Sequence, residues 1–453
     1  MNSYLISSTK KSSGKTIFTL GLLRLLKRLG YYPSPFKKGP DFIDPLWLSR
    51  AADRPCYNLD FYISSNSEIK KTFQNNILKN NFSIVEGNKG LFDGMSISGS
   101  DSNAALAKLL KLEVILVLDC TGTTRGVAPL LNGYKNFDKK INFKGVVLNN
   151  IAGDRHEGKI IGSIQEYTDF DVLGSIQKNK KLEVLERHLG LEPVFQSIGS
   201  DKIINQISSI IKSSINLESI LPKKIPKNKK NRIILMNNKT KYKNLTIGIA
   251  KDKAFGFYYP DDLERFESLG IKIKAFDTIR DKKIPNVDAL FFGGGFPEIV
   301  ASELSKNIKM KSSIFTYIDS DKPVYAECGG FMYLCESITF NRKKYKMVGA
   351  IKGNIMMHKK PIGRGYIKLN INKQHPWFES QTEIRAHEFH YSDVKLLNNK
   401  YKFAYDVKRG HGINGKKDGL IYKNLLASYA HLRDTQQSQW VEKFVKFIHD
   451  CKK

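Results

Sequence analysis

The stretch "YLISSTKKSSGKTIFTLGLLRLLKRLG", residues 4–30, decides the fold of the first half of the chain. Its apolar run at 4–7 predicts a strand. Over residues 14–30, leucines and other apolar residues recur at helical spacing, and Gly30 stands where a helix ends. A strand that passes through a short polar loop into a helix is the local unit of phosphate-binding α/β domains.

The loop in this stretch ends in Gly14, Lys15 and Thr16, as a phosphate-binding loop does. Backbone N–H groups of such a loop hold phosphate oxygens, Lys15 would reach the outer phosphates, and Thr16 would ligate Mg²⁺. The glycine expected at the start of the loop is absent, while Lys10 would add a second positive contact. The stretch therefore predicts a site for a nucleotide and Mg²⁺.

Further apolar runs continue the alternation of strands and helices in the first half. Each run ends at or near a polar or acidic residue, and such continuous runs suit strands that are covered on both faces of a parallel sheet. Ligands of open α/β sheets bind at the carboxyl ends of strands, which is where these polar residues fall. The runs are "FSIVEG" (82–87), "VILVLDC" (114–120) and "GVVLNNI" (145–151).

Acidic residues near these strand ends are candidates for metal binding. Mg²⁺ on a nucleotide needs one or two carboxylates, with water completing its coordination. Glu86, which ends the first of the runs, is the best candidate. Asp93, Asp41 and Asp44 stand on nearby loops, and Asp119 is a weaker candidate. Each of these acids could instead cap the helix that follows it.

A change of composition divides the chain in two. Residues 219–244 are rich in Lys, Asn and Pro and are interpreted as a basic interdomain linker between domains at 1–218 and 245–453. A second alternation of strands and helices follows the linker. Its strands are expected at "LTIGIA" (245–250), "ALFFGGG" (289–295) and "PVYAE" (323–327).

The composition indicates a globular protein and leaves the meaning of its charge open. The formal net charge is +30, and the hydrophobic fraction is 41%. The charge would suit a nucleic acid or a small polyanion. Because the lysines are scattered without interleaved aromatic residues, solvated basic faces are favoured. No apolar run is long enough to span a membrane, no secretion signal is evident, and five unpaired-looking cysteines indicate a reducing, cytoplasmic location.

Several segments, in the same order over nearly the whole chain, resemble cobyrinic acid a,c-diamide synthase. That family joins a phosphate-loop synthetase domain to a class I glutamine amidotransferase-like domain. It amidates the a and c carboxylates of a corrin precursor with ATP, Mg²⁺ and glutamine. The segments are "PFKKGPDFIDPLWLSRAADRPCYNLD" (35–60), "VEGNKGLFDG" (85–94), "GGGFPE" (293–298), "AECGGFMYL" (326–334), "RGYIKL" (364–369), "HEFHYS" (387–392) and "LLASYAHLR" (425–433).

The resemblance implies an α/β fold with two three-layer domains. The first would be a P-loop NTPase domain with a parallel sheet, similar to dethiobiotin synthetase, and the second a flavodoxin-like amidotransferase domain. Asp41, Glu86 and Asp93 would be the acids of the synthetase site, with Glu86 serving the metal. Asn149 would contact the adenine, and Arg155 or His156 the substrate. The expected partners are a corrinoid polycarboxylate, ATP and glutamine, without nucleic acid or membrane, and the sequence allows a homodimer.

The resemblance also assigns a task to Cys328, which stands between an apolar run and two glycines. A cysteine at a sharp strand-to-helix turn would attack the glutamine amide, release ammonia and leave a thioester for hydrolysis, with the helix N-terminus favouring thiolate. His431 is the expected base. Arg433 stands where many amidotransferases carry an orienting acid, so no third member is assigned.

Other residues of the second domain complete this expectation. The oxyanion would be held by N–H groups of Gly329 and of the loop Gly293, Gly294 and Gly295. Cys335 would be a buried structural thiol. Two further histidines, His387 and His390, lack a third ligand and are assigned to a substrate or interface loop instead of a metal site.

Three alternatives to cobyrinic acid amidation remain open at this point. One is a,c-diamidation of Ni-sirohydrochlorin in the coenzyme F430 pathway, which shares these motifs. Another is a nucleic-acid-associated P-loop ATPase, which would leave Cys328 and His431 unused. The last is an ATP-binding protein whose amidotransferase domain is inactive.

Overall fold

The computed structural model describes residues 2–78, 81–179, 182, 199–221, 242, 244–379, 382–398 and 400–453. The chain forms two compact units, Met1–Ile233 and Ile234–Lys453, which are described one at a time. The linker predicted at 219–244 lies mostly outside the described residues. Its first residues belong to the packing of the first unit, because Ile220 is buried there and its carbonyl accepts a hydrogen bond from Tyr4 Oη at 3.2 Å.

The first unit is built on a parallel seven-stranded sheet, in agreement with the sequence prediction. The order is β3-β2-β4-β1-β5-β6-β7, and all neighbouring strands run parallel. Strands β1, β4, β5 and β6 are the four apolar runs predicted from the sequence. The bounds are β1 Asn2–Ser8, β2 Ser34–Lys38, β3 Tyr57–Leu59, β4 Phe82–Glu86, β5 Glu113–Asp119, β6 Phe143–Ile151 and β7 Val172–Gln177.

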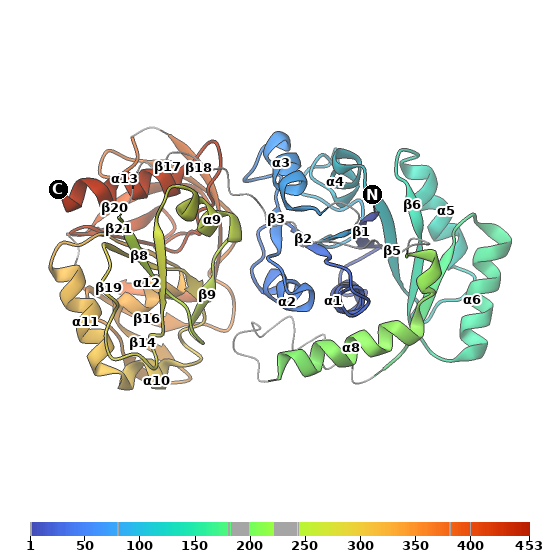
Figure 1. Cartoon of the computed structure of the whole chain (residues 1–453), viewed down its shortest axis with the longest axis horizontal. Helices are drawn as coiled ribbons and strands as arrows, with labels where there is room; N and C mark the ends of the chain where they lie inside the picture. Colours follow the sequence, from blue (N-terminus) through green and yellow to red (C-terminus); the bar gives the residue numbers. More distant parts are fainter. Residues whose placement is uncertain are drawn as a thin grey trace. The chain divides into compact units, whose positions relative to one another are not determined.

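Helices cover both faces of this sheet, which gives the first unit three layers (Figure 1). One face carries α1 (Lys15–Arg28), α2 (Ile43–Ala52) and α8 (Ser200–Ser214). The other carries α3 (Asn66–Asn76), α4 (Asn103–Leu110), α5 (Val127–Phe137) and α6 (Asp154–Tyr167). A short 3-10 helix, η1, spans Leu217–Ser219. Strands buried on both faces explain why β5 reads as a continuous apolar run.

The second unit has a mixed nine-stranded sheet in the order β10-β8-β11-β13-β22-β21-β20-β17-β18. From β10 to β22 the strands are parallel, which matches the flavodoxin-like prediction, and from β22 to β18 they are antiparallel. The sequence analysis did not identify the antiparallel strands. The bounds are β8 Thr246–Ala250, β10 Lys272–Phe276, β11 Ala289–Phe292, β13 Val324–Glu327, β17 Gly363–Ile371, β18 Glu383–His390, β20 Lys402–Arg409, β21 Lys417–Tyr422 and β22 Leu425–Ser428.

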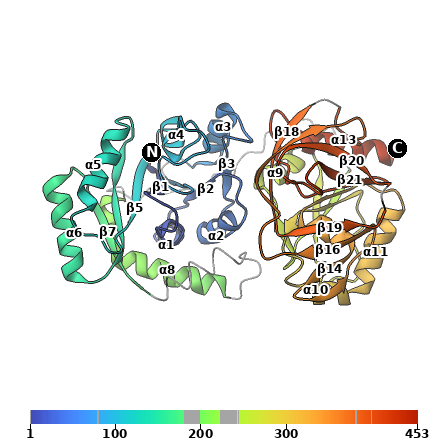
Figure 2. The same ribbon diagram turned by 180° about the vertical axis from the view of Figure 1, so that it is seen from behind.

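Two layers pack on this sheet. Helices α9 (Pro260–Ser268) and α13 (Trp440–Lys452) cover one face. The other face carries α10 (Ala301–Lys306), α11 (Ile308–Asp319) and α12 (Gly329–Leu334). Figure 2 shows β14, β16 and β19 on the same side as α10 and α11. The small sheets comprise β15-β14-β16-β19 and β12-β9, with β9 Phe255–Phe257, β12 Gly294–Gly295, β14 Cys335–Phe340, β15 Lys343–Lys346, β16 Ile351–Met357 and β19 Ser392–Leu396.

Candidate active sites

The phosphate-binding loop of the first unit connects β1 to α1. The Lys15 side chain is buried and its Nζ donates to Ser8 Oγ at 2.8 Å and to the Lys10 carbonyl at 3.4 Å. Ser13 Oγ donates to the same carbonyl at 2.9 Å. Lys10 itself extends outward and forms an ion pair with Asp119 at 3.0 Å. The predicted phosphate contacts Lys10 and Lys15 therefore stand on one loop at the carboxyl end of the sheet.

Gly14 is required where it stands for two reasons. Its φ of +88° lies in the left-handed region, and a Cβ atom there would lie 2.3 Å from Asn149 Nδ2. Asn149 Nδ2 donates to the Ser13 carbonyl at 3.0 Å. Asn149, near the end of β6, thus holds the phosphate loop through a hydrogen bond. Its predicted contact with adenine stays a prediction.

An acidic cluster with a buried lysine at its centre lies beside this loop. Thr16 Oγ1 donates to Glu86 Oε1 at 2.9 Å, so the first helical turn reaches the end of β4. Lys37 Nζ lies 2.6 Å from the same oxygen and 2.5 Å from Asp44 Oδ2. The order β2-β4-β1 places the end of β2, which carries Lys37, next to Glu86. The sequence analysis did not single out Lys37.

Burial controls the charges in this cluster. Burial lowers the pKa of Lys37, but Asp44, Glu86 and Asp41 raise it by more, so its pKa lies above the ordinary value. Burial raises the pKa of Glu86 against the opposing effect of Lys37. Burial and the charge of Asp44 likewise raise the pKa of Asp41. Lys37 therefore lowers the pKa of Asp44 and limits the rise that burial causes in the pKa of Glu86 and of Asp41.

The donor set at this point fits Mg²⁺. The Thr16 hydroxyl and the Glu86 carboxylate are hard oxygen ligands, and Glu86 Oε2 is buried without a hydrogen-bond partner among the described residues. The described part of the chain holds no group of three or more His, Cys, Asp or Glu side chains able to bind a metal by itself. Such an ion would accordingly share its coordination with the nucleotide phosphates.

Asp93 stands on a turn that touches the phosphate loop. Its Oδ2 accepts a hydrogen bond from the Gly90 N–H at 2.9 Å. A Cβ atom on Gly90 would lie 2.7 Å from the Thr9 carbonyl, so the turn and the loop are in close approach. The structure thus places Glu86 at the end of β4 and the acids at 41 and 93 on loops at the same edge of the sheet, while Asp119 is held by Lys10 and Asn150.

A surface cavity of about 410 Å³, lined by Arg155 and His156 among others, opens at this edge, where β6 ends. His156 Nδ1 accepts the Ala152 N–H at 3.1 Å, and Nε2 lies 2.6 Å from the Thr123 carbonyl. Both ring nitrogens of His156 are therefore used by the main chain. The predicted substrate contact of Arg155 or His156 stays a prediction.

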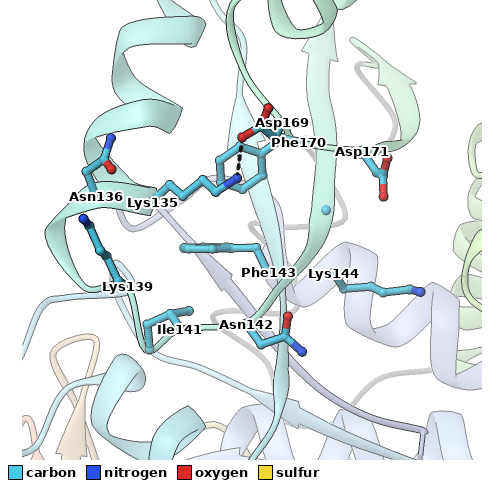
Figure 3. A pocket seen from close by; sticks show the side chains of 11 residues that line it. Lys135, Asn136, Lys139, Ile141, Asn142, Phe143, Lys144, Asp169, Phe170 and Asp171 are labelled. Carbon is cyan, nitrogen blue, oxygen red and sulfur yellow. Dashed lines mark hydrogen bonds and ion pairs between the residues drawn. The ribbon is translucent and has the colours of Figure 1, made fainter.

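Another cavity, of about 460 Å³, lies at the opposite edge of the sheet (Figure 3). It is lined by the end of α5 and the start of β6, and Lys135 crosses it to pair with Asp169 at 2.8 Å. Because the phosphate loop follows the carboxyl end of β1, this cavity at the amino end of β6 is remote from the nucleotide site.

Cys328 occupies the turn between β13 and α12 in the second unit. Its φ of +47° is rare for a residue with a side chain, so the backbone is strained at the predicted nucleophile. The Cys328 N–H donates to the Ser428 carbonyl at 2.7 Å, and Sγ lies 3.7 Å from the Phe389 carbonyl. Burial and then the charge of Glu298 raise the pKa of this thiol above its usual value. The Gly329 N–H at the start of α12 lowers this pKa, in the direction the sequence analysis expected, but the effect of burial is larger.

The structure places a carboxylate, that of Glu327, beside His431, for which the sequence analysis assigned no orienting acid. His431 Nδ1 lies 3.3 Å from Glu327 Oε2. Glu327 Oε1 accepts hydrogen bonds from the Leu432 N–H at 2.9 Å and from Tyr325 Oη at 2.7 Å. Arg433, where an acid was sought, instead pairs with Asp261 at 2.7 Å. Glu327 is therefore the candidate that orients His431.

The glycine loop that was expected to bind the oxyanion lies against this pair. A Cβ atom on Gly294 would lie 2.4 Å from His431 Cε1, and one on Gly329 would lie 2.8 Å from the Gly295 carbonyl. Larger residues would therefore displace the histidine or the loop. The Gly293 N–H donates to Tyr258 Oη at 3.0 Å and is already used. Gly294, Gly295 and Gly329 stay the candidates for the oxyanion site.

The two histidines of β18 do not form a metal site within the described residues. His387 pairs through its backbone with His431, and burial followed by the charge of His431 lowers the pKa of His387 to about 3. His390 Nδ1 lies 2.8 Å from the Ser392 carbonyl, and its ring stacks on Tyr429. Both histidines lie on strand β18 and not on a loop as the sequence analysis expected, and Cys335 is buried as expected.

Comparison with known proteins places both units in one family. The chain is 38% identical over 98% of its length to a cobyrinate a,c-diamide synthase from Magnetococcus marinus, 96% of which is covered. The chain belongs to the cobyrinate a,c-diamide synthase family. A relative of that name from Archaeoglobus fulgidus is 35% identical over 97% of the chain and 96% of its own length. Another, from Methanosphaera stadtmanae, is 34% identical and covers 95% of each chain.

Family models agree with this membership. Residues 246–437 match the CobB/CobQ-like glutamine amidotransferase domain, and residues 2–185 match an AAA domain. The predicted family, fold class and enzyme class, an amidotransferase of the ligase type, are therefore confirmed. Among the described residues, no helix has the length and apolar character that crossing a membrane requires.

Replacement of Glu327 by glutamine is expected to lower kcat for glutamine hydrolysis by about 10- to 100-fold, with KM little changed. The amide retains the size of the side chain but removes the charge that stabilises a protonated His431. Steady-state release of glutamate measures this effect. Glu336→Gln, which alters an acid paired with Lys352, is the matched control and should leave kcat unchanged. An equal loss of ammonia-driven activity in Glu327→Gln would contradict the role.

Proposed function

We propose that this chain converts the a and c side-chain carboxylates of cobyrinic acid to amides, with ATP as co-substrate and glutamine as nitrogen donor. The observation that carries the proposal is full-length similarity to proteins named cobyrinate a,c-diamide synthase, in a chain that has both a phosphate loop and a strained cysteine turn. A carboxylate does not react with ammonia at neutral pH because oxide is a poor leaving group. Activation by ATP and delivery of ammonia are thus both needed.

The first unit would activate the carboxylate. The phosphate loop and Lys15 hold the outer phosphates of ATP, and the substrate carboxylate attacks the γ-phosphorus to form an acyl phosphate and ADP. Thr16 and Glu86 would hold Mg²⁺, which supplies neutralisation of phosphate charge when bound. Asp41 and Asp93, at the same edge, position the substrate or ammonia. Ammonia then attacks the acyl carbon, and inorganic phosphate leaves.

The second unit would supply the ammonia. His431 accepts the Cys328 proton as Sγ attacks the carboxamide carbon of glutamine, and it returns the proton to the departing ammonia. N–H groups of Gly294, Gly295 and Gly329 are proposed to stabilise the oxyanion. Water then hydrolyses the thioester to give glutamate. Because burial raises the pKa of Cys328, His431 and its partner Glu327 are needed to remove this proton.

Mass spectrometry of the products tests the proposed substrate. Incubation of cobyrinic acid with the enzyme, ATP, Mg²⁺ and glutamine is expected to convert two carboxylates to amides, with two ATP and two glutamine consumed per molecule. Ni-sirohydrochlorin, assayed in parallel, is expected to react poorly. Preferential amidation of the nickel tetrapyrrole would replace the proposed substrate by that alternative. ATP hydrolysis that is stimulated by DNA, without amide formation, would overturn the proposal.

A further inference from the structure

Glu298 is a partly buried acid near the nucleophile, and the mechanism above gives it no task. It follows the glycine loop at 293–295 and precedes α10. Its Oε2 is inaccessible to solvent and has no hydrogen-bond partner among the described residues. Burial raises its pKa to about 7, so the folded chain holds this carboxylate in an unfavourable environment. An isolated carboxylate in such a place requires an explanation.

The position of Glu298 ties it to the cysteine turn. A Cβ atom on Gly329 would lie 3.0 Å from Pro297 Cδ, so the segment that carries Glu298 is in contact with the turn. The charge of Glu298 also acts on the Cys328 thiol and raises its pKa, more than that of the adjacent Glu327 does. Glu298 therefore lies near enough to Cys328 for its charge to act on the thiol.

This negative charge opposes the chemistry of the thiol unless a cation joins it. It disfavours the thiolate and also disfavours an oxyanion formed on the attacked carbonyl. No ion pair joins Glu298 to a basic side chain of the described residues. The other anions near the thiol, Glu327 and Asp418, have partners of their own, since Glu327 accepts from Leu432 and Asp418 from Tyr429. A positive charge is thus missing at Glu298 in particular.

We propose that Glu298 binds the α-ammonium group of the glutamine that Cys328 attacks. The assignment rests on the proposed function of the second unit. An L-α-amino acid places its ammonium a few bonds from the side-chain carboxamide, so a single substrate spans the thiol and the acid. Binding neutralises Glu298, relieves its effect on the thiol and couples recognition of the amino acid to activation of the nucleophile. Glu298 is thereby a determinant of specificity for glutamine over simple amides.

Replacement of Glu298 by glutamine tests this role because it removes the charge and keeps the size. We expect KM for glutamine, measured by glutamate release without corrinoid, to rise about 10- to 100-fold, the range expected for loss of one hydrogen bond to a charged group. Ammonia-driven amidation should be unchanged. Glu303→Gln, which alters an exposed acid on α10, is the matched control and should leave both activities unchanged.

Two further measurements distinguish binding from a structural role. Glutaramate, which is glutamine without its amino group, should be hydrolysed much less well than glutamine by the wild type, and Glu298→Gln should lose this preference. The melting temperature of Glu298→Gln should be equal to or higher than that of the wild type, because an unpaired buried charge is removed. A lower melting temperature, an unchanged KM or a retained preference for glutamine would overturn the assignment.

The role of Glu298 can be tested whichever corrinoid is the substrate. A chloroketone analogue of glutamine should alkylate Cys328 in the wild type, and glutamine should protect the thiol, whichever tetrapyrrole is the substrate. In Glu298→Gln the concentration of glutamine needed for protection should rise about 10- to 100-fold, as the KM for glutamine does. Failure to amidate cobyrinic acid would therefore overturn the proposed substrate alone, whereas unaltered protection would overturn the role of Glu298.

Discussion

Replacement of Cys328 by alanine is expected to abolish glutamine hydrolysis, by about 10⁴-fold or more, and to leave ammonia-driven amidation in place. The mutation removes the sulfur that would attack the carboxamide, while the phosphate loop and acid cluster belong to a separate compact unit. Amide formation is measured with glutamine and with ammonium chloride at a pH where free ammonia is present. Only the first assay should fail.

Cys335 provides the matched control for this experiment. It is also a buried cysteine, at the start of β14, and its pKa is likewise raised by burial. Cys335→Ala should retain both activities, with at most a modest loss of stability from the smaller side chain. Loss of both activities in a folded Cys328→Ala protein would contradict the division of labour between the two units. Retained glutamine hydrolysis would exclude Cys328 as the nucleophile.

The strands of the first unit could be predicted because their burial is visible in composition. Strands β1, β4 and β5 are covered on both faces and therefore read as continuous apolar runs. Strand β2 was missed because its sequence, SPFKK, contains two lysines that are nevertheless buried. Only the spatial order of the strands shows that β2 lies beside β4, and thus that Lys37 meets Glu86.

The second unit shows where local pattern is insufficient. Strands such as β17, "GRGYIKLNI", have short alternation and no apolar run, and they follow one another without the helices of a parallel sheet. The partner of His431 was sought two residues downstream because the resemblance suggested that place. The parallel pairing of β13 with β22 instead sets Glu327 opposite Ser428, three residues before the histidine. Neighbours across a sheet cannot be read from their separation along the chain.

Cys328 and Glu298 illustrate a further limit of the sequence. Motif and resemblance identified the thiol and the turn that carries it, but they also suggested a thiolate. Burial decides the state of the thiol, and burial depends on the packing of β18 and of the loop at 293–298 around it. In the sequence, Glu298 is only the last residue of the segment GGGFPE. That its Oε2 has no hydrogen-bond partner among the described residues depends on packing and is seen only in the folded unit.

Replacement of Lys37 by methionine is expected to destabilise the first unit by about 3–5 kcal/mol, the cost of removing one partner from a buried ion pair. Lys37 Nζ contacts both Glu86 and Asp44, and its removal leaves these carboxylates buried without their cation. Synthetase activity should fall as well, because without Lys37 the acids hold protons more tightly and protons then compete with Mg²⁺ for them. Denaturant unfolding in EDTA measures the stability, and ATP-dependent amidation with ammonia measures the activity.

The loss of stability in Lys37→Met should depend on pH. Without Lys37, the pKa of Glu86, already raised by burial, rises further, and Lys37 no longer lowers the pKa of Asp44 against the effect of burial, so the native state of the mutant binds more protons than its unfolded state. Its stability then falls as pH increases through the raised pKa values. The difference from the wild type should therefore be larger at about pH 8 than at about pH 5. A deficit that is independent of pH would indicate lost packing alone.

Lys38 is the matched control on the same strand. It is also buried, but its Nζ donates to the neutral Asn88 Oδ1 at 3.2 Å, and burial lowers its pKa. Lys38→Met removes a hydrogen bond to an amide and should cost about 0.5–1.5 kcal/mol, less than Lys37→Met. Mg²⁺ with ATP should restore part of the stability of Lys37→Met, since a divalent ion replaces the missing charge beside Glu86. Equal losses in the two variants, or no response to Mg²⁺ and ATP, would show that Lys37 is not the counter-ion of the metal-binding acids.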